Sequence, residues 1–454
     1  MPRCWTIAEF EGFCEDRPAL VLEPRDGFQS LPATHFAALK ELLGILPTSA
    51  GDEENSGSPL FSLSHDRRLG DVIKARNHVG VIAFADGSQI EILPKLARKV
   101  TTRTPADTER HRELLLRMLR DAFDIDPALG GPTDLRLARL PLLEAFFRMF
   151  LASLERLVKR GLPGGYVRVE SNERFFKGKL LVSEQLRQNL VRRERFCVAH
   201  DVFLSDTPPN RLLRSGLEYV RSHAATEENR RAADRLRPAF DEIPLSRNPV
   251  ADFGASSTAC RDTLQREALR WCEVFLLDRG LANLPGTRRA RAFLFPMETV
   301  FERSVARALR RHAPDGVEIS VQEKKLFLFE ESPHGSAFRL NPDIVIRRGR
   351  DILAIADTKW KLLFDEPGKN FGMSQSDLYQ MYAYQKRYNA PLSLLIYPFH
   401  ETLGSFSATP PAFRTPTDSD LRVLFWNPAN VSAASASAAD VFAAALEPPH
   451  ELDT

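Results

Sequence analysis

Hydrophobic and polar positions alternate in two different ways along the chain, and the change divides it into regions. Over residues 1–104, short apolar runs are separated by turns. The run NHVGVIAFADGSQIEILPKL holds two apolar segments split by Asp-Gly, which predicts a β-hairpin. Over residues 105–285, apolar residues recur every three or four positions, as in LLEAFFRMFLASLERLVKRGL, a pattern typical of amphipathic helices. Gly161 and Pro163 should end that helix.

From Pro296 onward, helical and strand patterns alternate, which predicts an α/β domain over residues 286–430. The predicted helices span 299–311 and 376–388, and the predicted strands span 318–321, 325–329, 343–346, 352–357 and 392–397. The Ala/Ser-rich stretch 431–454 is expected to be a peripheral tail. We expect a surface loop at Thr48–Pro59 and a linker at Arg247–Ala259. The predicted class is therefore multidomain α+β: a mostly β N-terminal domain, a helical middle region and a C-terminal α/β domain.

Composition describes an ordinary globular chain of 454 residues with a formal net charge of only +2, so any nucleic-acid surface must be local. The five cysteines are scattered and none forms a CxxC pair, which argues against a disulfide framework or a zinc ribbon and favours a reducing cytoplasm. No signal-peptide pattern is present at the N-terminus. The most apolar stretch, from Leu140, contains Glu144 and Arg148, so we expect a buried helix and no membrane association.

Candidate chemistry concentrates in the stretch NPDIVIRRGRDILAIADTKWKLL, Asn341–Leu363. If the turn centres on Gly349–Arg350, facing residues have numbers that sum to about 700, so Asp343 lies opposite Asp357. Lys359 shares the face of Asp357 if the strand continues. Two facing carboxylates repel unless a cation neutralises them, and a hard divalent cation prefers oxygen ligands. The alternative is structural: Asp343 caps a strand, and Asp357 forms a surface salt bridge with Lys359.

The pattern PD…DTK resembles the PD-(D/E)xK nuclease superfamily, whose core order of helix, three strands, helix and strand approximates the order predicted here. The segment QMYAY resembles the QxxxY motif of the RecB-like branch, and Gln380 and Tyr384 would share one helical face. Tyr384 alone could equally be packed on the sheet. Glu302 matches the acidic position on the first core helix of these nucleases, with Glu298 as a competitor. The resemblance implies metal-dependent DNA cleavage, with Mg²⁺ or Mn²⁺ held by Asp343, Asp357 and Glu302 and with Lys359, Gln380 and Tyr384 completing the site.

A second resemblance covers most of the chain. The stretch Gly161–Leu217, which includes VESNERFFKGKL and DVFLSDTPPNRLL, looks like the central signature of the McrC family, and GSQIEILPKL resembles its N-terminal β segment. The family implies a restriction system against DNA with modified cytosine, in which an AAA+ ring hydrolyses GTP. This chain lacks a GxxxxGK[ST] loop, so GTP is expected on the partner only. His200–Asp201 has no further spaced ligands and is interpreted as structural rather than as a metal pair.

A basic stretch lies inside the McrC-like region. Arg174–Arg195 contains seven Lys or Arg residues against two Glu. Its candidate contact residues are Lys177, Lys179, Arg192, Arg193 and Arg195. They could meet DNA phosphates, dock on the partner ring, or form a solvated helix face.

We therefore expect a Mg²⁺-dependent DNA endonuclease subunit of a McrBC-like, type IV restriction system, which works on double-stranded DNA with a McrB-like AAA+ GTPase hexamer. Two alternatives stay open. The first is a stand-alone RecB-like nuclease, which would cut without a partner. The second is a non-catalytic activator of the ring.

Overall fold

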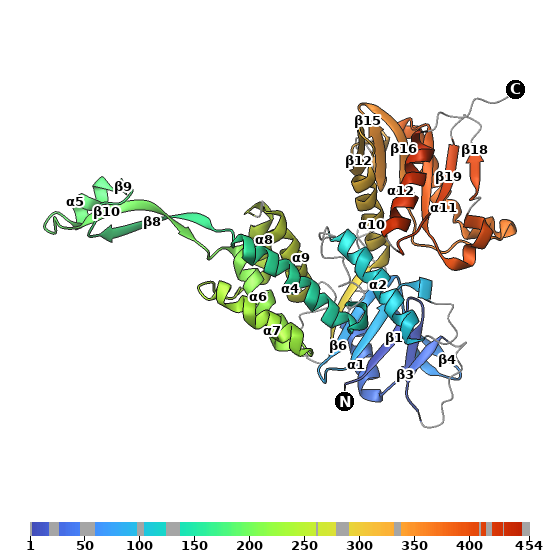
Figure 1. Cartoon of the computed structure of the whole chain (residues 1–454), viewed down its shortest axis with the longest axis horizontal. Coiled ribbons are helices and arrows are strands. Elements are labelled where there is room, and N and C mark those ends of the chain that lie inside the picture. The colour runs from blue at the N-terminus through green and yellow to red at the C-terminus, as the bar shows by residue number, and fades with distance from the viewer. Residues whose placement is uncertain are drawn as a thin grey trace. The chain divides into compact units, whose positions relative to one another are not determined.

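A computed structural model describes most of the chain, which divides into two compact units: Met1–Leu142 together with Leu284–Thr454, and Leu143–Asn283 (Figure 1). The residues described are 2–17, 27–45, 60–97, 104–123, 137–259, 262–277, 290–330, 337–407, 410–414, 420–429 and 431–446. The expected surface loop at Thr48–Pro59 lies outside them. Within the described residues, no helix is both long and apolar enough to span a membrane.

The N-terminal region contains two four-stranded sheets with strand orders β1-β7-β6-β11 and β3-β2-β5-β4. The predicted hairpin is confirmed, since β6 and β7 pair antiparallel. The elements are β1 Cys4–Ala8, β2 Gly12–Glu15, β3 Phe28–Leu31, α1 Ala33–Ile45, β4 Phe61–Asp66, β5 Gly70–Ala75, β6 His78–Phe84, β7 Gln89–Leu93 and α2 Pro105–Ala122.

The first sheet is completed by a strand from far along the chain. Strand β11, Ala290–Pro296, pairs antiparallel with β6. A Cβ on Gly80, which has φ +136°, would lie 2.0 Å from the carbonyl oxygen of Phe293, so only glycine permits this close approach. The chain thus completes the N-terminal sheet at β11 before it enters the C-terminal sheet. The expected domain boundary at residue 286 therefore does not separate these two sheets.

The unit Leu143–Asn283 is not purely helical. Its helices are α4 Leu142–Arg160, which begins one residue before the unit, α5 Val182–Gln188, α6 Pro208–His223, α7 Glu227–Leu236, α8 Pro249–Ala259 and α9 Thr263–Leu276. Helix α4 ends before Gly161, as predicted. However, β8 Gly165–Glu173, β10 Phe196–Leu204 and β9 Lys179–Leu180 form a three-stranded sheet, order β8-β10-β9. Helix α5 ends at Gln188, and the expected linker at Arg247–Ala259 is mostly helix α8.

The β8–β10 ladder extends from the helices of its unit as a long arm, with α5 and β9 near its far end (Figure 1). We call residues 165–204 the arm. The two long strands carry alternating β-branched and aromatic residues, as in GYVRVESNE and FCVAHDVFL. This period of two lies between two stronger helical patterns, which is why the helical prediction for the middle region fails here.

The C-terminal region is built on a six-stranded mixed sheet of order β12-β15-β16-β17-β19-β18. Its predicted elements were confirmed to within two residues at most ends. The predicted elements are α10 Met297–His312, β12 Val317–Val321, β13 Phe327–Phe329, β15 Ile344–Arg348, β16 Asp351–Thr358, α11 Gln375–Tyr388 and β17 Leu392–Pro398. The structure adds β14 Ala337–Arg339, β18 Ala412–Arg414, β19 Asp420–Trp426 and α12 Val431–Leu446, which were not predicted. Strands β13 and β14 form a separate hairpin.

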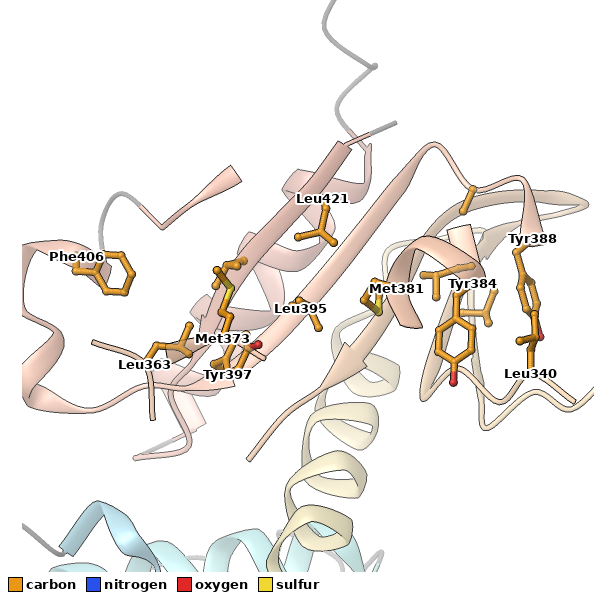
Figure 2. Close-up of a cluster of buried hydrophobic side chains, with 14 of the residues drawn as sticks. Leu340, Leu363, Met373, Met381, Tyr384, Tyr388, Leu395, Tyr397, Phe406 and Leu421 are labelled. Atoms are coloured by element: carbon orange, nitrogen blue, oxygen red, sulfur yellow. The ribbon is translucent and has the colours of Figure 1, made fainter. Parts of the chain in front are cut away.

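One face of this sheet packs against α11. Figure 2 shows Met381, Tyr384 and Tyr388 of this helix among buried residues of the sheet such as Leu395 and Leu421. The expected peripheral tail is wrong for residues 431–446, because α12 buries Ala438, Val441 and Phe442. An Ala-rich helix offers a narrow apolar face that packs closely, so composition alone did not reveal its burial.

Candidate functional site

The hairpin β15–β16 has the register that the sequence predicts. Ile344 pairs with Ala356 and Ile346 with Ala354, so the numbers of facing residues sum to 700 in this part of the ladder. Gly349 has φ +60° and opens the two-residue turn between Arg348 and Asp351, a conformation that glycine adopts without strain. A bulge near Arg347 shifts only the turn end of the ladder.

Alternation along the two strands then decides which side chains meet. Val345 and Ile355 face the core beneath α11. Asp343 precedes β15 by one residue and Asp357 lies two residues beyond Ile355, so both carboxylates are on the α11 face at the end of the hairpin away from the turn. The geometry thus brings together residues that lie at opposite ends of the hairpin sequence.

Direct contacts join most of the predicted site. The Asp343 Oδ2 accepts hydrogen bonds from the backbone N–H and the hydroxyl of Thr358, both at 2.8 Å. The Lys359 Nζ lies 2.6 Å from Oδ2 of Asp357 and donates to Gln380 Oε1 at 2.9 Å. Asp357 is only 2% exposed, so its ion pair with Lys359 is buried and the surface salt-bridge interpretation does not describe it.

The helix α11 positions the two residues of the QxxxY pattern. Gln380 donates to the Tyr384 hydroxyl at 3.0 Å, and that hydroxyl donates to the carbonyl of Asn341 at 3.2 Å. The Tyr384 ring is at the same time part of the core under the helix (Figure 2). Tyr384 therefore packs on the sheet and also links α11 to the segment that leads into Asp343.

The site is electrostatically unfavourable for two negative charges. Burial raises the pKa of Asp357 to about 7, and the nearby charge of Asp343 adds to this effect. Burial and the charge of Glu302 raise the pKa of Asp343 to about 6. Lys359 acts in the opposite direction on both carboxyls. Burial also raises the pKa of Glu302, whose carboxylate accepts a hydrogen bond from Gln322.

These groups line an open cavity of about 470 Å³. Two buried oxygens there accept no hydrogen bond: Asn341 Oδ1, and Asp357 Oδ2, whose ion pair with Lys359 lacks hydrogen-bond geometry. Among the described residues, no group of three His, Cys, Asp or Glu side chains is arranged to hold a metal ion by itself. Two carboxylates with raised pKa values and spare oxygen acceptors nevertheless suit a hard divalent cation that keeps several waters. The residues present fit such an ion.

Sequence reasoning missed several residues that the fold adds to this cavity. Asp377, on the first turn of α11, lies 2.6 Å from Lys361 and 3.9 Å from Lys359. Ser374 caps this helix by accepting from the Asp377 N–H. The S-x-x-D pattern and the three-residue spacing to Gln380 were the available signals. Glu302 and its competitor Glu298 both line the cavity.

The basic candidate residues lie on the arm and not at this cavity. Lys177, Lys179, Arg192 and Arg193 are exposed, whereas Arg195 is half-buried and donates to the carbonyl of Asn172. They occupy β9 and loops, so they do not form one solvated helix face. Beside them are exposed apolar side chains, including Phe175, which is 82% exposed, and Val191, which is 91% exposed.

Comparison with known proteins identifies the family. The profile of the McrBC 5-methylcytosine restriction system component matches residues 73–398. No curated protein matches the chain significantly.

Two solved structures are similar. One is described as a refined half-complex from a tetradecameric assembly of Thermococcus gammatolerans McrB AAA+ hexamers with bound McrC. Its sequence identity to this chain is 20%, the alignment covers 96% of this chain and 100% of that chain, and the TM-score is 0.61. The other, a cryo-EM structure of the Thermococcus gammatolerans McrBC complex, has 22% identity, 69% and 88% coverage, and a TM-score of 0.45. Because the family profile spans most of the chain, the protein belongs to the McrBC 5-methylcytosine restriction system component family.

Proposed function

We propose that this chain is the Mg²⁺-dependent DNA endonuclease subunit of a McrBC-like restriction system. The observation that carries the proposal is the convergence of Asp343, Asp357 and Lys359 on one face of a hairpin, at a cavity of about 470 Å³. A merely structural ion pair would not need a second buried carboxyl whose pKa is also raised. Shifted carboxyls beside a cation in an open cavity are typical of a catalytic site.

The order of elements supports the same proposal. Helix α10, strands β12, β15 and β16, helix α11 and strand β17 follow the core order of the PD-(D/E)xK nucleases that the sequence resembles. The antiparallel pair β15–β16 is followed by the parallel pair β16–β17, which places α11 as the crossover above the site.

Each residue then has a physical role. Asp343 and Asp357 would hold the ion, with Glu302 and the Asn341 amide oxygen lining the same cavity. When bound, Mg²⁺ supplies Lewis-acid activation of the scissile phosphate. Thr358 orients the Asp343 carboxylate through two hydrogen bonds. Lys359, positioned by Asp357 and Gln380, provides a cation that orients the attacking water and stabilises charge on the phosphate.

We also propose that the arm contacts a partner protein, an AAA+ ring like the McrB AAA+ hexamers of the similar complex. Exposed Phe175 and Val191 beside Lys177 and Arg192 combine an apolar patch with positive charge. DNA phosphates would use the charge but leave the apolar side chains in water, whereas a protein surface can bury both. Hydrogen bonds among Asn172, Gln185 and Asn189 stabilise the end of the arm from which these side chains project.

The test is reconstitution with a McrB-like AAA+ ring protein, on modified and unmodified DNA with GTP and Mg²⁺. The wild-type chain and Asp351→Asn, an exposed change at the turn end of the same hairpin, should support cleavage, and Asp343→Asn should not. The Asp343→Asn protein should still stimulate GTP hydrolysis by the ring. Cleavage by Asp343→Asn would overturn the site, and cleavage without the ring would favour a stand-alone nuclease.

A further inference from the structure

A buried carboxylate far away in the sequence contacts the segment that carries Lys359. Glu9 follows β1 in the N-terminal sheet and is 0% exposed. Its carboxylate accepts from the indole N–H of Trp360 at 2.9 Å and 3.2 Å, and from the backbone N–H of Lys95 at 2.8 Å. The two residues 9 and 360 belong to the same compact unit.

Trp360 is held from three directions. Its backbone carbonyl accepts a hydrogen bond from the Lys95 ammonium, which also lies 5.3 Å from the indole centroid. Its ring packs on Phe301, whose centroid is 5.2 Å away, and Phe301 directly precedes Glu302 on α10. With only 2% of its surface exposed, Trp360 is fixed between the N-terminal sheet and α10.

The backbone around Trp360 explains why this matters for the neighbouring residue. The Lys359 N–H still donates to Ile396 on β17, but Lys361 N–H donates back to the Lys359 carbonyl at 2.8 Å, so the chain turns off the sheet here. After the turn, Lys361 pairs with Asp377. The N–H side of Lys359 is therefore held by β17, while its carbonyl side leads directly into the turn that Trp360 anchors.

Burying a carboxylate is unfavourable unless it is paired and hydrogen-bonded. Burial raises the pKa of Glu9 to about 7, while Lys95 and the Trp360 hydrogen bond lower it. Among the described residues, the hydrogen bonds to this carboxylate come from Lys95 and Trp360, so the buried group connects the N-terminal sheet to the Lys359 segment.

We infer that Glu9 is a positioning residue for the nuclease site: through Trp360 it holds the backbone of Lys359 so that the ammonium stays at Asp357. The N-terminal sheet is then part of the catalytic apparatus and not only an attachment for other domains. The expected effect on DNA cleavage rests on the proposed nuclease function, whereas the expected effect on the backbone at residues 358–362 does not.

The test uses Glu9→Gln, which removes the negative charge and one of the two acceptor oxygens, and Trp360→Phe, which keeps the ring on Phe301 but removes its N–H. The matched control is Glu15→Gln, a partly exposed acid on β2 of the second N-terminal sheet. The first measurement is amide hydrogen exchange of the full-length chain, followed on peptides covering residues 358–362. We expect at least tenfold faster exchange there in both variants, with unchanged protection of β6 and β7.

The second measurement is the rate of DNA cleavage by the reconstituted complex at saturating DNA. Glu9→Gln and Trp360→Phe should each lower kcat by about tenfold with KM for DNA unchanged, and the double variant should be no worse than either single one, because both remove the same contact. Unchanged exchange at residues 358–362 in both variants would overturn the inference. Additive losses in the double variant would also overturn it, and a wild-type complex that never cleaves would refute the nuclease proposal instead.

Discussion

Replacing Asp357 by asparagine should stabilise the metal-free protein at pH 8. In the folded chain, burial and Asp343 raise the pKa of Asp357 from 3.8 to about 7. The folded state therefore binds more protons than the unfolded state between pH ~4 and ~7, and stability falls as pH rises through this window. At about 1.4 kcal/mol per pKa unit, the full effect is ~4 kcal/mol at pH 8.

Part of this gain should be lost because Lys359 loses its partner. Burial lowers the pKa of Lys359, but the charge of Asp357 and its neighbours raises it overall, with Asp357 as the largest contributor to the increase. We therefore expect a net increase of roughly 1–2 kcal/mol in the free energy of unfolding at pH 8. Near pH 4 we expect little increase, because Asp357 is then protonated in the folded state and only about half ionised in the unfolded state. Asparagine keeps the shape of the side chain, so packing should not contribute.

The assay is denaturant unfolding in EDTA at pH 4, 6 and 8, followed by repetition with Mg²⁺ at pH 8. The control is Asp351→Asn, on the same strand but exposed, which should change little at any pH. Mg²⁺ should stabilise the wild type and the control but not Asp357→Asn. Equal or lower stability of Asp357→Asn than wild type at pH 8 would refute the claim that this carboxylate is electrostatically strained.

Three further predictions concern Lys359, the arm and helix α12. Lys359→Met should abolish cleavage and move Mg²⁺-dependent stabilisation to higher pH, because Lys359 lowers the pKa of Asp357; an unchanged pH profile in a Mg²⁺ titration would contradict this. Val191→Ser, and the pair Arg192→Ala with Arg193→Ala, should raise the concentration needed for half-maximal GTPase stimulation without changing DNA binding in a salt titration; a flatter salt slope would instead assign these arginines to DNA phosphates. Phe442→Ala should destabilise the protein by ~3–5 kcal/mol in denaturant unfolding, against less than ~1 kcal/mol for the exposed Leu446→Ala, because α12 buries Phe442 in its core. Equal effects would mean that α12 does not pack as described.

Much of the candidate site could be predicted because its key residues are coupled by local geometry. A glycine turn and a period of two fix which residues face each other in a hairpin, so Asp343, Asp357 and Lys359 could be placed on one face before any packing was known. Gln380 and Tyr384 meet because of the helical period alone. Where local period was misleading, as in the arm, the prediction failed.

The sequence by itself determined the type and position of most elements in the C-terminal sheet, the hairpin register and the face of α11, because each depends on residues within a few positions of one another. Only the tertiary structure decided which distant segments meet. It brought β11 back to the N-terminal sheet and placed Asp377 beside Lys361. It also buried α12 and set Glu9 against Trp360, 351 positions away. Such contacts arise when apolar faces and buried polar groups find complementary partners, and no local period in the chain encodes which partner that is.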